Sequence, residues 1–229
     1  MTLMAIGGHI GDMELTAGGV LATRSLAGDT IVTVALTAGE KGNPPDQSVA
    51  EYRTQKVREA KEFADLLGGT SVVFPYVDGE LVVSDDAAYA LCDCIREHKP
   101  DVLITHWHRS IHKDHTATNE IVARAQYYAG VPGFERDLPP HFARGPYFAE
   151  NWEDPDGFSP TIYVVVSADG FALWRKAIER HWFTVHSTSF AYRDYYSHLM
   201  AVRGIEVRRQ YAQAFDVPPL AKRRVVDTL

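Results

Sequence analysis

Short apolar segments alternate along this chain with longer amphipathic segments. The run at 29–36 is apolar and β-branched over most of its length, which is typical of a strand buried on both faces of a parallel sheet. Segment 48–67 carries charged residues on one side and apolar residues on the other, and this pattern predicts a helix that ends at Gly68. Because the β-α alternation repeats, we expect a mostly parallel sheet covered by helices.

We expect these elements to form one α/β domain spanning residues 1–229. The 45% hydrophobic content is enough for a substantial core. The predicted fold class is Rossmann-like, with a mostly parallel sheet flanked by helices and a C-terminal strand and helices. The composition at 131–159 shifts to Pro, Gly and aromatic residues, which predicts a long irregular connection. Strands are expected over 2–7, 29–36, 71–74, 102–105 and 161–167, and helices over 12–26, 48–67, 85–98, 169–186 and 191–203.

Charge and composition narrow the classes of partner. The net charge is −7, so a general affinity for nucleic acid is not expected, and the basic residues 222–224 are interpreted as a solvated tail. No apolar run approaches the ~20 residues that a membrane helix needs. Cys92 and Cys94 lie two apart in a helical segment, so they neither bridge each other nor form a zinc pair. We expect a cytoplasmic protein with a small-molecule substrate, and the sequence leaves homo-oligomerisation open.

Polar side chains follow the predicted strands at the points where they end. His9 and Asp12 follow the first strand, and segment 106–115 follows the fourth. Ligands of such sheets bind beyond the carboxyl ends of the strands, so these side chains are expected to meet at one rim. Two imidazoles and one carboxylate can hold a divalent metal and leave a position open for water. A plainer interpretation makes Asp12 a helix N-cap and lets His9 bond to the main chain.

A dinucleotide site is the first alternative for a glycine-rich turn after a strand. The fingerprint G-x-G-x-x-G ending at Gly11 requires glycine where this chain has Ile6, so the fingerprint fails. A nucleotide-binding oxidoreductase is therefore supported only by the β-α alternation.

With its motifs Gly8-His9-Ile10-Gly11-Asp12 and His112-Lys113-Asp114-His115, the chain resembles the LmbE-like, or PIG-L, family of zinc-dependent N-deacetylases. Their pattern is H-P-D-D-x-E after the first strand and H-P-D-H after a later one. The resemblance continues through Glu14, residues 37–40, 78–81 and 211–215. It implies Zn²⁺, or another divalent metal, bound by His9, Asp12 and His115. It further implies that His112 faces the reacting group, that Asp114 lies nearby, and that the reaction removes an N-acyl group, usually acetyl, from an amino-sugar-containing small molecule.

One residue departs from the family pattern. Gly11 stands where the family usually has an aspartate that acts as general base, and glycine cannot transfer a proton. Glu14, Asp114 and Glu40 are the candidate replacements. A metal-activated water without a base would react more slowly, since a positioned base contributes ~10²–10⁴-fold. The alternative is a metal-binding family member with altered or lost amide hydrolysis, acting in a specialised biosynthetic pathway.

Further residues are candidates for contacts with the substrate. Glu40 and Lys41 lie in a loop at the predicted rim, and Arg53 lies on the helix that follows. The remaining histidines of interest lie near the fourth strand and in the C-terminal half, and no ligand role is assigned to them: His106, His108, His181 and His186.

Overall fold

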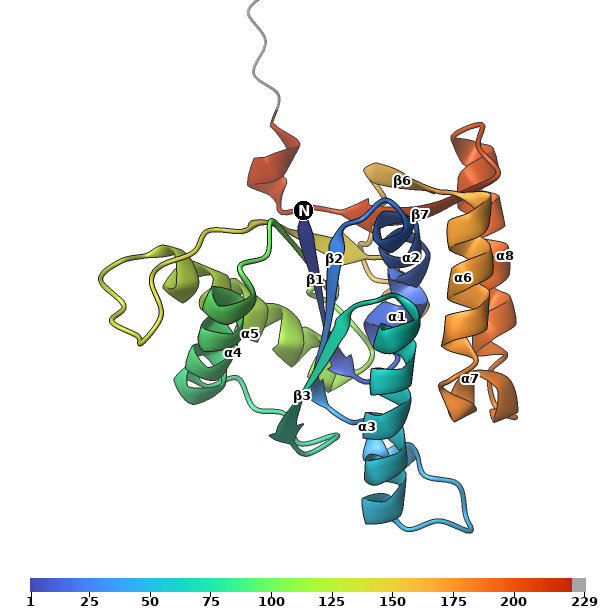
Figure 1. Ribbon diagram of the computed structural model, residues 1–229, viewed down its shortest axis with the longest axis horizontal. Helices are drawn as coiled ribbons and strands as arrows, with labels where there is room; N and C mark the ends of the chain where they lie inside the picture. The colour runs from blue at the N-terminus through green and yellow to red at the C-terminus, as the bar shows by residue number, and fades with distance from the viewer. Residues whose placement is uncertain (224–229) are drawn as a thin grey trace, which may run out of the picture.

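The computed structural model describes residues 1–223, and in it a single twisted sheet separates two layers of helices (Figure 1). The strands are β1 (Thr2–His9), β2 (Thr30–Thr37), β3 (Thr70–Tyr76), β4 (Val102–Thr105), β5 (Arg144–Ala149), β6 (Ile162–Val166) and β7 (Tyr211–Asp216). The α-helices are α1 (Asp12–Thr16), α2 (Gly18–Leu26), α3 (Val49–Leu66), α4 (Asp85–His98), α5 (Lys113–Gly130), α6 (Ala168–Ile178), α7 (Trp182–His186) and α8 (Tyr192–Glu206). Two short 3₁₀ turns complete the set, η1 (Glu40–Gly42) and η2 (Pro219–Lys222).

The sheet has the order β3-β2-β1-β4-β5-β7-β6. Neighbouring strands are parallel from β3 to β5, whereas β7 runs antiparallel to both β5 and β6. This mostly parallel sheet flanked by helices confirms the predicted fold class. Helices α4 and α5 cover one face, and α1, α2, α3 and α6 cover the other (Figure 1).

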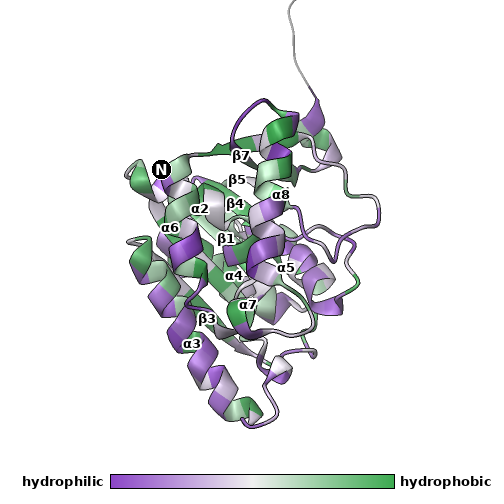
Figure 2. Ribbon diagram, turned by 90° about the vertical axis from the view of Figure 1, so that its right-hand side faces the viewer, coloured by the Kyte–Doolittle hydropathy of each residue, from purple (hydrophilic) through white to green (hydrophobic). Residues whose placement is uncertain are grey.

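The apolar strands are explained by burial on both faces. Leu3 and Ala5 of β1 pack into the core beneath α2 and α6, whereas Met4 and Ile6 pack into the core beneath α4 and α5. Successive side chains of a strand point to opposite faces, so a central strand must be apolar throughout. The helices are mixed in hydropathy, and α3 is largely polar (Figure 2). A few large apolar residues of the helices are exposed, among them Val57 of α3 and Ile205 of α8.

The predicted helix over 12–26 is interrupted, and a distant residue stabilises the break. The structure has α1 and α2 with Ala17 between them. The buried Gln213 of β7 donates through Nε2 to the carbonyl of Thr16 at 2.9 Å and accepts at Oε1 from the amide of Val20 at 2.8 Å. Its amide thus satisfies main-chain groups that an unbroken helix would have paired internally. The predicted helix over 169–186 likewise divides into α6 and α7.

The prediction of an irregular connection over 131–159 is wrong in one part, because it contains β5. Strand β5 includes Gly145 and Pro146, which weaken the local signal for a strand. Its pairing with β4 is non-local, so it is visible only in the folded chain. The preceding loop is held by the buried Arg96 of α4, whose guanidinium donates to main-chain carbonyls, among them those of Leu138 and Phe134 at 2.8 and 3.0 Å.

The strand order places a crevice next to β1. From β1 the chain proceeds to β2 and β3 on one side, and then returns to place β4 on the other side. Crevices of this kind, at the carboxyl ends of strands where the order reverses, are the usual ligand sites of open α/β sheets. The turns after β1 and β4 therefore face each other. No helix within residues 1–223 is both long enough and apolar enough to cross a membrane.

Candidate metal centre

Three side chains from the turns after β1 and β4 converge in this crevice. His9 is the last residue of β1, Asp12 begins α1, and His115 lies in the first turn of α5. The Nδ1 atom of His9 lies 3.2 Å from Nε2 of His115 and 3.2 Å from Oδ2 of Asp12. The Nε2 atom of His115 is also 3.2 Å from Oδ2 of Asp12. The three atoms thus form a nearly equilateral triangle.

This triangle has the dimensions of one face of a tetrahedral metal site. Ligands at about 2.0–2.1 Å from a tetrahedral zinc ion are separated from each other by about 3.3 Å, close to the distances observed here. Burial raises the pKa of Asp12, but the imidazoles of His115 and His9 outweigh it and hold that pKa well below its usual range. Asp12 is therefore a carboxylate at neutral pH. The donor set fits a divalent ion, and the side chains expected to share one lie together.

Carboxylates behind the imidazoles orient them. The Nε2 atom of His9 lies 3.1 Å from Oδ1 of Asp78 and 3.5 Å from Oδ2 of Asp114. On the other side, Nδ1 of His115 lies 3.3 Å from its hydrogen-bond partner, Oγ of Ser110, and 3.6 Å from Oε2 of Glu153. A carboxylate next to the outer ring nitrogen fixes the tautomer of a metal-binding histidine and makes it a stronger ligand. Asp78 and Glu153 were not among the sequence-predicted site residues, although Asp78 belongs to a motif that supported the resemblance.

His106 lies closer to the centre than its sequence context indicated. It is fully buried, stacks on His115 with 3.9 Å between ring centroids, and places Nε2 3.1 Å from Oδ2 of Asp12. The amide of Gly8 donates to the same Nε2 at 3.0 Å. His106 directly follows β4, whose last residue is Thr105, and is buried, whereas His108, two residues further along, is exposed. The sequence signal that points to it is therefore only the position at the end of a strand.

His112 faces the cavity from the N-terminal end of α5. Its Nδ1 accepts a hydrogen bond from the amide of Asp114 at 3.3 Å, which leaves the ring proton on Nε2. One of its ring nitrogens lies within 4.8 Å of ligand atoms of His9 and His115. Burial, followed by the charges of His9 and His115, lowers the pKa of His112. It is therefore a neutral hydrogen-bond donor.

Gly11 has a backbone conformation and surroundings that suit only glycine. Its φ is +106°, in the left-handed region. A Cβ atom at this position would lie 2.4 Å from Cζ of Phe183, a residue of α7. An aromatic ring therefore fills the space beside the metal ligands in which a longer side chain at residue 11 would lie.

Comparison with known proteins agrees with this geometry. A family model described as PIG-L, GlcNAc-PI de-N-acetylase, matches residues 4–126, which is more than half of the chain and includes every ligand of the candidate centre. The chain belongs to the PIG-L family. The match supports a deacetylase- or hydrolase-like enzymatic role.

Solved structures share the fold of this PIG-L chain over almost its whole length. The 4-carboxy-2-hydroxymuconate hydratase GalB of Pseudomonas putida is 19% identical, with a TM-score of 0.87 over 100% of this chain and 99% of that one. The N,N'-diacetylchitobiose deacetylase of Pyrococcus horikoshii is 21% identical, with a TM-score of 0.82 over 95% and 84%. The conserved protein TT1542 of Thermus thermophilus is 23% identical, with a TM-score of 0.79 over 94% of both chains.

The carboxylates proposed from the sequence as replacements for the base lie outside the cavity lining. Glu14 is buried and accepts from the amide of Gly11 at 3.0 Å, as part of the N-terminal cap of α1. Burial raises its pKa to about 7. Asp114 is fully buried and accepts from the amide of Gly79 at 2.7 Å. Glu40 accepts from the amide of Asp78 at 3.2 Å.

The side chains predicted to contact the substrate are also turned toward the protein. Lys41 pairs with Glu80 at 2.6 Å, and Arg53 pairs with Glu40 at 3.2 Å and donates to the carbonyl of Phe74 at 3.0 Å. Neither these two nor Glu40 lines the cavity in this PIG-L chain. Lys56, one helical turn after Arg53 on α3, lines it instead. Which residue of α3 reaches the cavity is decided by packing.

The candidate ligands His9, Asp12 and His115 line a cavity of about 550 Å³. Its walls come from the loop before α3, from α3 itself, and from the C-terminal segment around α7. Aromatic side chains form much of the surface, and the lining carboxylates are Asp12, Asp78 and Glu153. The volume suits a small-molecule ligand. The aromatic lining residues are Tyr52, Trp152, Trp182, Phe183, Tyr192 and Tyr196.

The remaining histidines have separate positions. His181 is fully buried beside Phe63 and outside the cavity lining, whereas His186 of α7 lies on the cavity wall.

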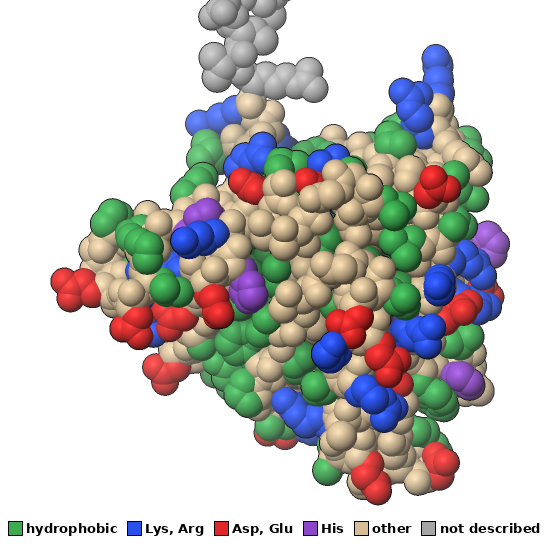
Figure 3. Space-filling view, viewed as in Figure 1, with side chains coloured by type: hydrophobic (Ala, Val, Ile, Leu, Met, Phe, Trp, Pro, Cys, Tyr) green, Lys and Arg blue, Asp and Glu red, His purple; other side chains and the backbone are tan. Residues whose placement is uncertain are grey.

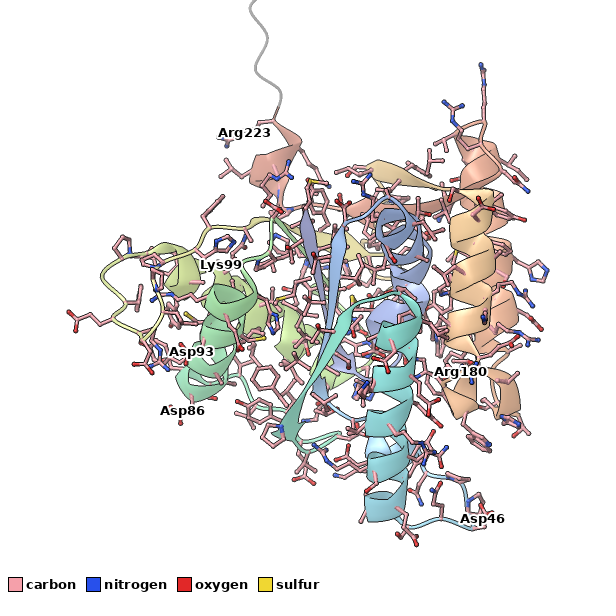
Figure 4. The ribbon with its side chains drawn as sticks, in the orientation of Figure 1. Asp46, Asp86, Asp93, Lys99, Arg180 and Arg223 are labelled. Atoms are coloured by element: carbon pink, nitrogen blue, oxygen red, sulfur yellow. The ribbon has the colours of Figure 1, made fainter. Side chains whose placement is uncertain are left out.

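Charged residues of both signs are interspersed over the face seen in Figure 3, without a continuous basic patch there. Asp46 lies in the loop before α3, and Asp86 and Asp93 project from the outer side of α4 (Figure 4).

Proposed function

We propose that this PIG-L chain is a zinc-dependent hydrolase that removes an acyl group, usually acetyl, from an amino-sugar-containing small molecule. The observation that carries the proposal is the triangle of His9, Asp12 and His115 at the floor of a cavity large enough for such a substrate. Zinc is favoured because two imidazoles and one carboxylate are a common catalytic donor set for this ion. Bound there, it supplies Lewis-acid polarisation of a carbonyl and a lowered pKa of water.

The residues around the centre supply hydrogen bonds and proton transfer. His112 donates through Nε2 to the oxygen that gains negative charge when the amide carbonyl is attacked. Asp78 and Asp114 hold His9 in its ligand orientation, since both contact its outer nitrogen.

Glu153 is the carboxylate best placed to act as general base. Of the three carboxylates that line the cavity, Asp12 belongs to the ligand triangle and Asp78 accepts from the amide of Lys41 at 2.8 Å. Within residues 1–223, the one ion-pair partner of the Glu153 carboxylate is Nδ1 of His115, at 3.6 Å. Burial raises its pKa, which makes it a stronger base than a solvated glutamate. It takes the proton from the attacking water and delivers it to the departing amine.

Addition of water to a carbon–carbon double bond is a second candidate. The ring of Phe183 favours this reaction, because it fills the space beside Gly11 in which the family usually has the side chain of its base. The similarity to a hydratase over the full length of both chains supports it as well. In this case the family member has lost amide hydrolysis, and Glu153 and His112 serve proton transfer to an unsaturated acid.

Metal analysis combined with mass spectrometry tests both candidates. Purified protein is loaded with zinc, and release of amine is followed over a panel of N-acetylated amino sugars and their conjugates. We expect turnover by the wild type, retained zinc with about 10²–10⁴-fold slower turnover in Glu153→Gln, and loss of both zinc and turnover in His115→Ala. Zinc-loaded protein that releases no amine but hydrates an unsaturated acid supports the second candidate. Protein that binds no divalent metal contradicts both.

A further inference from the structure

Lys56 presents a buried ammonium group to the cavity. The residue is 5% exposed, lies on α3 and lines the cavity wall. The hydrogen bond of its Nζ in the described structure is a long one, 3.4 Å to the carbonyl of Gly39. An ammonium has three donors, so two are unused. The rings of Phe183 and Tyr52 lie 4.9 and 5.7 Å from Nζ and provide cation–π contacts without a counter-charge.

This ammonium lies next to the candidate metal centre. A Cβ atom added to Gly39 would lie 2.7 Å from Nζ of Lys56 and 3.0 Å from Cβ of His9, so the two side chains flank one small space. Gly39 has no side chain to separate them. Lys56 and His9 both line the cavity, so a molecule bound at the candidate centre has this ammonium close by.

The local charges leave Lys56 without an ion pair. Asp12, Asp78, Glu59 and Glu14 attract it electrostatically, yet within residues 1–223 none of these carboxylates forms an ion pair with it. Buried charges in proteins are normally paired, because an unpaired one is costly. Because the unpaired ammonium of Lys56 faces the cavity, we infer that its negatively charged partner is a group of the bound ligand.

We propose that Lys56 binds a carboxylate of the substrate, which makes the substrate an organic acid whose carboxylate lies close to the reacting carbon. A single ammonium among aromatic rings suits a compact, singly charged group, whereas phosphate is usually recognised by several donors or by an arginine fork. The proposal rests on the proposed function only in placing the reacting group at His9, Asp12 and His115.

Calorimetric titration of the zinc-loaded protein tests the proposal without turnover. Succinate is compared with succinamate, in which one carboxylate is replaced by a neutral amide of similar shape. We expect succinate to bind about 10- to 100-fold more tightly, the range that one charge-assisted hydrogen bond provides. Lys56→Met should abolish this preference, and Lys56→Arg should retain it. Arg58→Met removes an exposed charge of the same helix and should change nothing.

Folding and zinc content are measured for each variant. Methionine fills a similar volume and removes a buried charge, so Lys56→Met should keep its zinc and melt no lower than the wild type. Equal binding of succinate and succinamate by the wild type overturns the proposal, as does an unchanged preference in Lys56→Met. Tighter, Lys56-dependent binding of inorganic phosphate overturns the assignment to a carboxylate.

The outcomes separate this inference from the proposed hydrolysis. Zinc-loaded protein that binds succinate through Lys56 but releases no amine supports the carboxylate site and contradicts the hydrolase. Protein that deacetylates uncharged sugars and shows no preference for succinate supports the hydrolase and overturns the role of Lys56.

Discussion

Phe183 and Gly11 occupy complementary spaces: the Cζ atom of the ring lies 2.4 Å from the point where a Cβ of residue 11 would be. The two residues are far apart in the chain and meet because α7 packs over the turn that follows β1. A change at either position therefore alters the other. The base expected at residue 11 is not merely missing, since its space is used by an aromatic wall of the cavity.

Gly11→Asp alone should destabilise the protein and leave it without added activity. The positive φ costs about 1–2 kcal/mol for a residue with a side chain, and the contact with Phe183 adds to this cost. Gly11→Asp combined with Phe183→Ala removes the clash, and amide hydrolysis should then exceed that of Phe183→Ala alone. Melting temperatures and amine release measure the two effects. A single variant as stable as the wild type would contradict this account of the pair.

His9→Ala and His115→Ala should each lose stoichiometric zinc. Either change removes one corner of the triangle, and a zinc site with two protein ligands binds weakly. Elemental analysis after gel filtration measures the metal content. His108→Ala is the matched control, because this histidine is nearby in sequence but exposed, and it should bind zinc as the wild type does. Full zinc occupancy in His115→Ala would show that the ion lies elsewhere.

Acid should destabilise the metal-free protein through His181. Burial, with a smaller contribution from Lys56, lowers the pKa of this imidazole to about 3. The unfolded chain takes up the proton near pH 6.5, so the stabilisation is complete above that pH and is lost progressively as the pH falls toward 3. Between pH 7 and pH 5 the loss should be about 2 kcal/mol.

Urea unfolding with a chelator present measures this loss. His181→Leu introduces an apolar side chain of similar size that cannot bind a proton. The free energy of unfolding of this variant should therefore fall less between pH 7 and pH 5 than that of the wild type. An identical fall in both proteins would assign the acid sensitivity to other groups.

Arg96→Lys should destabilise the loop that precedes β5. The guanidinium of this buried residue donates to several carbonyls of residues 128–138, and an ammonium cannot reproduce the planar fork. The free energy of unfolding should fall by about 2–4 kcal/mol, because buried carbonyls lose charge-assisted donors. Urea unfolding and the rate of proteolysis within the loop measure it. Arg136→Lys, whose partner Asp93 is exposed, should cost less than about 1 kcal/mol.

Much of the fold was predictable from local pattern. Strand β4 and helix α4 have the expected bounds, and the buried strands are recognisable because both of their faces must be apolar. Strand β5 and the break between α1 and α2 were missed for a common reason. Each depends on hydrogen bonds from remote residues, β4 in one case and Gln213 in the other.

The candidate site likewise contains residues that local motifs predict and residues that only packing brings to the cavity. His9, Asp12 and His115 could be proposed from the sequence because each lies in a motif at the end of a strand, and the carboxyl ends of parallel strands meet at one rim. Lys56, Glu153 and Phe183 stand in no motif. They reach the cavity through the packing of α3, α7 and the segment after β5.

By itself, then, the sequence determined the layered fold and the family and predicted which three side chains meet at the rim, because hydrophobic periodicity and short motifs are local properties of the chain. Only the tertiary structure decided which carboxylate faces the cavity, which helix residue brings a cation to it, and what fills the space beside Gly11. These outcomes depend on which side chains of distant segments compete for the same volume, and that competition exists only after the chain has folded.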